Sequence, residues 1–180
     1  ELVSDWLSGL KGVTRSHDLN IRSALGFERE AELSRVLKIN AYSDIIKASD
    51  ADLWWLFDLA EGSDLDQIAH DWSKDSRLVV ITRGGDGASL YRNGKRLDVA
   101  APKVDLVDTV GAGDTYIANF LGELQELGAL GADARNRLMA LGDQELIAAA
   151  EFAAVAAGLV CERQGCEPPT KAEVQKLLAR

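Results

Sequence analysis

Short apolar runs alternate along this chain with longer stretches of helical periodicity, and no other feature constrains the fold as much. The runs "DIIKA" (44–48) and "RLVVIT" (77–82) have the length and β-branched content of buried strands. Helices are predicted over 2–10, 28–38, 50–57, 64–72 and 143–159. This alternation predicts a doubly wound α/β fold: a mostly parallel sheet with helices on both faces and right-handed crossovers.

Local signals refine that prediction. Residues 13–20 are expected to be extended, and residues 87–100 to form a hairpin, because Asn93-Gly94 is the dipeptide that a two-residue type I′ turn favours. The last helix is expected to start at Thr170, where "TKAE" has the capping-box form. Two further helical faces are expected from apolar spacing: Leu33, Val36 and Leu37 on one, and Ile117, Phe120, Leu121 and Leu124 on the other.

Length and composition limit the classes of function. The 180 residues suit a single domain over 1–180, and the formal net charge of −9 argues against nucleic-acid binding. The most apolar segment, "LIAAAEFAAVAAGLV", is interrupted by Glu151 and is shorter than the ~20 residues of a membrane span, so no membrane partner is expected. No signal peptide is recognised at the start, which is Glu1 rather than Met. We expect a cytoplasmic protein whose two cysteines, Cys161 and Cys166, are reduced.

Polar residues gather after the predicted strands. In open α/β sheets, ligands bind outside the carboxyl ends of strands, near a point where the strand order reverses. The residues in question are Asp18, Asn20 and Arg22, then Lys47, Ser49 and Asp52, then Thr82, Arg83 and Gly84, and finally the loop "DLVDTVGAGDTY" (105–116).

This last loop, called the glycine loop below, has the composition of an anion site. Gly111 and Gly113 leave backbone amides uncovered, and a helix that begins there adds unpaired amides and the positive end of its dipole. Asp114, in the first helical turn, would be kept ionised by that dipole and could serve as a general base. On these residues alone the alternative stays open that the glycines only allow a tight turn and that Asp114 only complements the dipole.

Two other glycine motifs fit poorly. A Rossmann fingerprint needs a third glycine or alanine where Tyr116 stands, and it needs a second strand, which residues 129–142 do not offer. Both absences argue against the hypothesis of an NAD-dependent oxidoreductase. The spacing into Lys-Ser or Lys-Thr that a Walker loop requires is also missing.

"VDTVGAGDTYIANFL" resembles the C-terminal signature of the ribokinase-like (PfkB) carbohydrate kinases. In the expected order, "HDLNIR" resembles the family's Asp-Pro-Asn-x-Arg segment, "KASDAD" its Asn-x-x-Glu segment and "VVITRGGDGASLY" its nucleotide strand. "AAVAAGLVCERQGCEPPT" resembles the closing helix and loop beside adenine. The resemblance implies ATP-dependent phosphorylation of a sugar hydroxyl, with ATP, Mg²⁺ and, as a further cation, K⁺.

The resemblance also implies residue roles. Asp114 is the expected base, with the amides of Gly111, Ala112 and Gly113 as the anion hole. Asp108 is the expected monovalent-cation residue, beside the loop from Cys161 to Cys166. The remaining expected residues are Thr82, Gly84 and Gly87 for ATP phosphates, Arg22 for a phosphate, Ser49 for the cofactor, Asp52 for Mg²⁺ through water, and Ala154 and Ala157 for adenine.

The chain also departs from the family pattern. Ser49 and Asp52 stand for the family's asparagine and glutamate, and an ordinary helix start capped by Ser49 is the alternative explanation of both residues. Leu19 replaces the family's proline, and Arg22 could instead be a solvated surface charge. The resemblance maps onto the C-terminal portion of a family member, so we expect a fragment without the N-terminal strands and lid, in which an exposed apolar edge favours a homodimer.

Three functions are therefore retained. A fructokinase-like activity is favoured, and 2-keto-3-deoxygluconate or another small sugar is the alternative substrate. A truncated, non-catalytic nucleotide-binding module is the alternative from another class.

Overall fold

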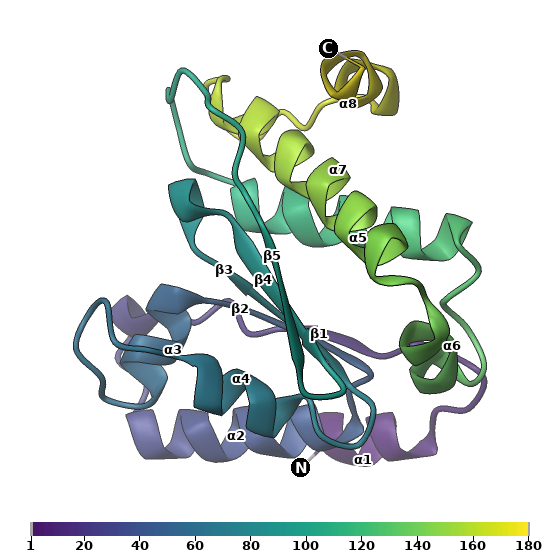
Figure 1. The fold of residues 1–180 in the computed structure, drawn as a ribbon. Helices are drawn as coiled ribbons and strands as arrows, with labels where there is room; N and C mark the ends of the chain where they lie inside the picture. The colour runs from purple at the N-terminus through teal and green to yellow at the C-terminus, as the bar shows by residue number, and fades with distance from the viewer. Residues whose placement is uncertain (1, 180) are drawn as a thin grey trace. The chain divides into compact units, whose positions relative to one another are not determined.

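The structure is a computed structural model that describes residues 2–179, and it confirms the α/β architecture (Figure 1). A mixed sheet is flanked by helices, and both faces of the central strands are buried, as expected for strands covered on both sides. The elements are α1 (Leu2–Gly9), β1 (Ser16–Asp18), η1 (Ser23–Leu25), α2 (Arg29–Tyr42), β2 (Ile45–Ser49), α3 (Asp50–Leu56), α4 (Asp66–Trp72), β3 (Leu78–Thr82), η2 (Gly84–Asp86), β4 (Ala88–Arg92), β5 (Lys95–Val99), α5 (Ala112–Glu126), α6 (Ala134–Ala140), α7 (Asp143–Cys161) and α8 (Lys171–Leu178).

The five strands have the order β1-β2-β3-β4-β5. Strands β1 and β2 are parallel, with His17 opposite Ile46. The amide of Leu78 at the start of β3 donates to the carbonyl of Asp44 just before β2, at 3.0 Å, so these two strands start side by side. The short connections from β3 to β4 and from β4 to β5 permit only antiparallel pairing. Because the order is sequential, the strands of residues 2–179 contain no point of reversal, contrary to our expectation.

The predicted hairpin is confirmed at β4 and β5. Asn93 and Gly94 connect the two strands with φ of 48° and 72°, the left-handed values that a type I′ turn requires at both central positions. The capping box at Thr170 is also confirmed, since its side chain accepts from the Glu173 amide.

The chain divides into two units. Unit 1 comprises the residues up to Ile81 together with Leu90–Arg96 and Leu130–Ala140. Its core lies where α2, α3 and α4 supply apolar side chains to the strands. The buried residues of this core are Leu19, Val36, Ile46, Ala48, Leu53, Leu56, Leu65, Ala69, Trp72, Val79, Ile81 and Tyr91.

Helix α2 differs from its prediction. It runs to Tyr42 rather than ending at 38, and Leu37, which was expected on the buried face, is 44% exposed. The buried face instead continues to Asn40, whose amide oxygen lies 2.7 Å from Nδ1 of His17. Burial lowers the pKa of His17, with this hydrogen bond opposing the effect.

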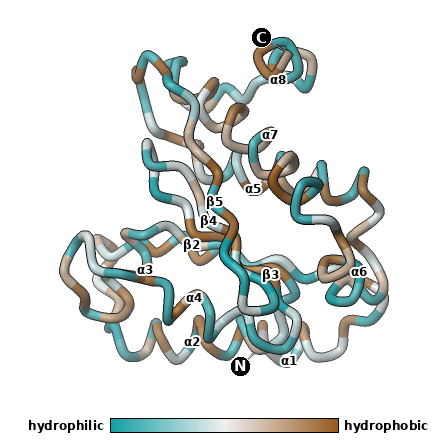
Figure 2. Tube along the Cα trace, in the orientation of Figure 1, coloured by the Kyte–Doolittle hydropathy of each residue, from teal (hydrophilic) through white to brown (hydrophobic). Residues whose placement is uncertain are grey.

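Unit 2 comprises Thr82–Ser89, Leu97–Ala129 and the residues from Leu141 onward. Its framework is helix α7, which contacts both α5 and α8. Phe120 and Leu124 of α5 are fully buried, as their predicted helical spacing required. Figure 2 shows that the apolar residues of α7 are interrupted by hydrophilic ones.

Helix α7 is the one described helix that is long and apolar enough, by length and composition alone, to cross a membrane. Within the structure, 56% of that stretch is buried. A helix in the core of a folded unit satisfies the same criterion, and the contacts of α7 with α5 and α8 are of that kind.

Candidate functional site

The glycine loop enters α5 as the sequence predicted. Gly111 caps the helix with φ of 80°, a left-handed value that favours glycine. The Ala112 amide donates to the Thr109 carbonyl at 3.2 Å, and Thr115 is the first residue whose amide donates back to Gly111. No acceptor among the described residues takes the amides of Gly113 and Asp114. These two amides, rather than that of Ala112, are therefore open to an anion in front of the helix.

Asp114 lies in the first turn of α5 and its side chain is exposed. The structure thus places a carboxylate beside the two open amides, in the arrangement that a base next to an anion hole requires.

The closing loop packs directly on this helix start. A Cβ atom added to Gly111 would lie 2.2 Å from Sγ of Cys166, so the cysteine occupies the space that any side chain at 111 would need. The sequence did not indicate this contact, because the two residues are brought together only by the fold.

Asp108 connects the glycine loop to the closing loop that contains Gly165. Its carboxylate accepts from the amides of Val110 and Gly165, each at 3.0 Å, and these backbone hydrogen bonds lower its pKa. Its own amide donates to the Cys161 carbonyl. Burial, reinforced by the charge of Asp108, raises the pKa of the Cys161 thiol. The predicted proximity of Asp108 to the 161–166 loop is confirmed, whereas its role toward a monovalent cation stays a prediction.

The residues predicted for ATP phosphates form a tight turn after β3. The Arg83 amide donates to the Gly87 carbonyl at 2.7 Å, and the Gly87 amide donates to Gly84. Gly87 has φ of 89°, and a Cβ there would lie 2.0 Å from the Val99 carbonyl oxygen. Gly84 is exposed, with φ of 48°, whereas Thr82 is half-buried. Gly87 is thus required for close backbone packing whether or not it also faces a nucleotide.

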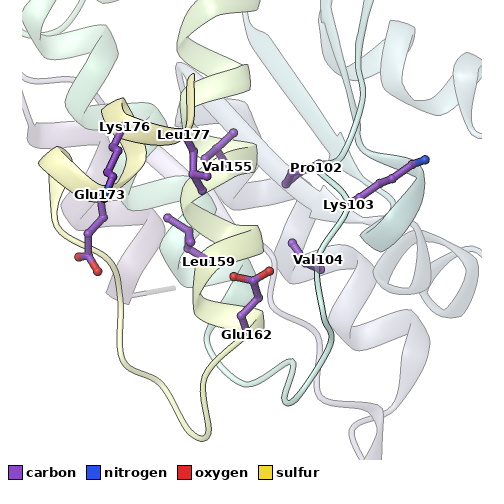
Figure 3. Close-up of a pocket in the computed structure, with 9 residues that line it drawn as sticks. All are labelled: Pro102, Lys103, Val104, Val155, Leu159, Glu162, Glu173, Lys176 and Leu177. Atoms are coloured by element: carbon purple, nitrogen blue, oxygen red, sulfur yellow. The ribbon is translucent and has the colours of Figure 1, made fainter. Parts of the chain in front are cut away.

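A pocket of about 470 Å³ lies in unit 2 between α7, α8 and the segment before the glycine loop. Figure 3 shows its apolar side chains gathered together, while the side chain of Lys103 points away from them. The lining residues are Pro102, Lys103, Val104, Val155, Leu159, Glu162, Glu173, Lys176 and Leu177.

The alanines predicted beside adenine do not line this pocket. Ala154 is buried and Ala157 half-buried on another part of α7, whereas Val155 and Leu159 face the pocket at the i, i+4 spacing of one helical face. The sequence already predicts Val155 and Leu159 on one side of this helix, but no binding role was assigned to that side. The adenine contacts of Ala154 and Ala157 stay a prediction.

The remaining candidates lie in unit 1, at the carboxyl ends of β1 and β2. Lys47 is buried and its Nζ atom donates to both carboxylate oxygens of Asp18, at 3.1 and 3.0 Å. Arg22 is exposed. Ser49 caps α3, as the alternative explanation of this residue required, since its hydroxyl accepts from the Asp52 amide at 3.1 Å.

Asp52, predicted to hold Mg²⁺ through water, is engaged by the backbone. One carboxylate oxygen accepts from the Ile21 amide at 2.9 Å and the other from the Ser49 amide at 2.8 Å. The residue is 8% exposed, which leaves little carboxylate surface for the water shell of a cation. Nowhere in residues 2–179 do three or more His, Cys, Asp or Glu side chains gather as a direct metal site.

Comparison with known proteins agrees with this geometry. The model of the pfkB family carbohydrate kinases matches residues 6–173. A fructokinase of Rhizobium leguminosarum bv. trifolii is 41% identical over 61% of this chain and 33% of its own length. A solved fructokinase from Xylella fastidiosa with bound ATP superposes with a TM-score of 0.79 at 22% identity, over 93% of this chain and 52% of that one. A Vibrio cholerae fructokinase solved with fructose, ADP and calcium gives 0.75 at 21% identity, over 98% and 54%.

The sheet, the flanking helices and a glycine loop opening a helix define a ribokinase-like α/β protein with a candidate anion site. More particularly, the chain belongs to the pfkB family of carbohydrate kinases. It spans about half the length of the fructokinases whose solved structures it matches.

Proposed function

We propose that this chain carries the nucleotide-binding and phosphoryl-transfer part of an ATP-dependent sugar kinase. The observation that carries the proposal is the start of α5, where the open amides of Gly113 and Asp114 lie beside the exposed carboxylate of Asp114. Phosphoryl transfer requires mainly electrostatic stabilisation and positioning, and this arrangement supplies fixed donors for the charge together with a proton acceptor.

In the proposed reaction, a sugar hydroxyl oxygen attacks the γ-phosphorus of ATP, the bond to the ADP oxygen breaks, and the hydroxyl proton passes to Asp114. The open amides of Gly113 and Asp114 stabilise the charge on the transferred group, whereas the Ala112 amide, predicted to join them, donates to the Thr109 carbonyl. Thr82, Gly84 and Gly87 are assigned to the ATP phosphates, Arg22 to a phosphate, and Ala154 and Ala157 to adenine. Mg²⁺ accompanies the ATP phosphates and neutralises their charge, and K⁺ is assigned to the neighbourhood of Asp108.

Fructose is the favoured acceptor, supported by the fructokinase names of the relatives. We retain 2-keto-3-deoxygluconate and other small sugars as alternatives, and we assign the protein to the cytoplasm, as a monomer or homodimer.

The decisive experiment measures ADP formation with a panel of sugars, in Mg²⁺ and K⁺, for the parent chain, Asp114→Asn and Asp105→Asn. Removing the base should lower kcat about 10²- to 10⁴-fold with little change in ATP affinity. Asp105, an exposed carboxylate of the same loop, serves as the matched control and should keep the parent rate.

Full activity of Asp114→Asn would show that the base is misassigned. If the parent binds ATP and transfers phosphate to no sugar, the chain acts as the nucleotide-binding module that is the alternative here.

A further inference from the structure

Asp52 connects two pieces of backbone in unit 1. Its carboxylate bonds the amide of Ile21, in the loop after β1, and the amide of Ser49, at the junction of β2 and α3. Hydrogen bonds between backbone N–H groups and a carboxylate are stronger than neutral ones, and burial strengthens them further. A single side chain therefore fixes the loop to the sheet edge.

The loop of residues 19–22 turns sharply at Asn20. This residue has φ of 45°, a left-handed conformation that is uncommon outside glycine but that asparagine adopts more readily than most residues. The Leu19 amide donates to the Lys47 carbonyl at 3.0 Å, and the Lys47 ammonium holds Asp18 at the start of the loop. With the bond from Ile21 to Asp52, these contacts secure the backbone on both sides of Asn20.

Side-chain length bears on what Asp52 can reach. The family segment that "KASDAD" resembles has a glutamate at this position, which extends one methylene further from the backbone. The shorter aspartate keeps its oxygens at hydrogen-bonding distance from two local amides, and only 8% of the residue is exposed.

We propose that Asp52 is a positioning residue that holds the 19–22 loop, and with it Arg22, and that it is not an organiser of the Mg²⁺ water shell. The part of this proposal that concerns Arg22 rests on the proposed function, in which Arg22 contacts a phosphate. The part that concerns the loop rests on unit 1 alone.

Amide hydrogen exchange tests the loop directly and needs no activity. Asn at position 52 has one acceptor oxygen instead of two, so Asp52→Asn should raise the exchange rate of the Ile21 or the Ser49 amide about tenfold. Asp52→Glu keeps the capping-box residue and should keep the Ser49 amide protected while releasing that of Ile21. Asp50→Asn, in the same helical turn, is the matched control and should leave both amides unchanged.

ATP binding tests the action through Arg22. Arg22→Gln and Asp52→Asn should each weaken ATP binding, by about three- to tenfold, and the double variant should be no weaker than Arg22→Gln alone. The direction of the change in ATP affinity is informative. Removing a negative charge from position 52 would by itself strengthen the binding of an anionic ligand, so weaker binding indicates that the loop has moved. The Mg²⁺ concentration for half-maximal ATP binding should stay within about twofold of the parent in Asp52→Asn.

The possible results distinguish the positioning role of Asp52 from the cation role and from failure of the proposed function. Unchanged exchange of both amides in Asp52→Asn overturns the positioning role, as does full additivity of the two substitutions. A tenfold rise in the Mg²⁺ requirement with unchanged exchange overturns it in favour of the cation role. If no variant, including the parent, binds ATP, the proposed function fails while the exchange data still decide the role of Asp52 in the loop.

Discussion

Gly111 satisfies two requirements at once. Its φ of 80° strains any residue with a side chain, and the place of a Cβ is taken by Sγ of Cys166 at 2.2 Å. The sequence predicts the first requirement, because a glycine before an acidic first turn is a common helix start. It cannot predict the second, which depends on a contact between segments more than fifty residues apart.

Gly111→Ala should therefore lower the free energy of unfolding by about 1–3 kcal/mol. Gly122→Ala is the matched control, because Gly122 lies within α5 with nothing near its Cβ position, and it should gain about 0.5–1 kcal/mol from helix propensity. Urea titration of both variants measures the two values. Equal stability of the two variants would show that the Cys166 contact relaxes freely.

Tyr116 is buried two residues after Asp114, and its hydroxyl has no hydrogen-bond partner among the described residues. Burial alone raises the pKa of this phenol, so it stays protonated at any physiological pH. A buried, unpaired hydroxyl costs free energy that a phenyl ring of the same shape does not.

Tyr116→Phe is thus expected to raise stability by about 1 kcal/mol. Tyr91→Phe should do the opposite, losing about 1–2 kcal/mol, because the Tyr91 hydroxyl donates to Asp66 at 2.6 Å. The thermal unfolding midpoints of the two variants, each compared with the parent, measure these changes. A loss of stability in Tyr116→Phe would mean that its hydroxyl is hydrogen-bonded in solution.

At the scale of elements, what the sequence predicts well is local. The turn at Asn93-Gly94 and the cap at Thr170 each depend on residues within a few positions of one another. The end of helix α2 was harder to predict, because its buried face includes the polar Asn40, whose partner His17 lies on a different element. The hydrogen bond from the Ile21 amide to the Asp52 carboxylate was not predicted for the same reason, because it connects the loop after β1 to the start of α3.

The cap of α8 makes a pH-dependent contribution. The pKa of Glu173 is lowered from 4.5 to about 2, because the amide and hydroxyl of Thr170, and then Arg163, donate to its carboxylate. A group whose folded pKa is depressed stabilises the fold above its unfolded pKa, and the contribution is lost as pH falls through the folded value. The loss should accordingly begin near pH 4.5 and finish near pH 2.

Glu173→Gln should flatten the dependence of the unfolding midpoint on pH between 4.5 and 2, relative to the parent. Circular dichroism melts at several pH values across this window measure the difference. Parallel curves for parent and variant would show that the cap adds nothing in solution, as is common for exposed ion pairs.

At the scale of the whole molecule, the net charge of −9 disfavours the anionic nucleotide that we propose as substrate. Local geometry resolves the conflict, because oriented amides and a helix N-terminus favour an anion within a few ångströms whatever the distant charge. A ligand held in this way binds only the folded chain, since the loop and the helix start have no counterpart in the unfolded state.

MgATP should therefore stabilise the chain against heat. At a concentration 100 times its Kd the gain is about 2.7 kcal/mol, which for a chain of this size raises the unfolding midpoint by about 5–10 °C. Asp114→Asn should keep the whole shift, because the carboxylate is proposed to accept a proton and not to bind the nucleotide. Chelating Mg²⁺ should reduce the shift, because the phosphates then bind without their counter-charge. A chain that shows no shift at millimolar MgATP does not bind the nucleotide, and that result would reject the proposed function before any sugar is tried.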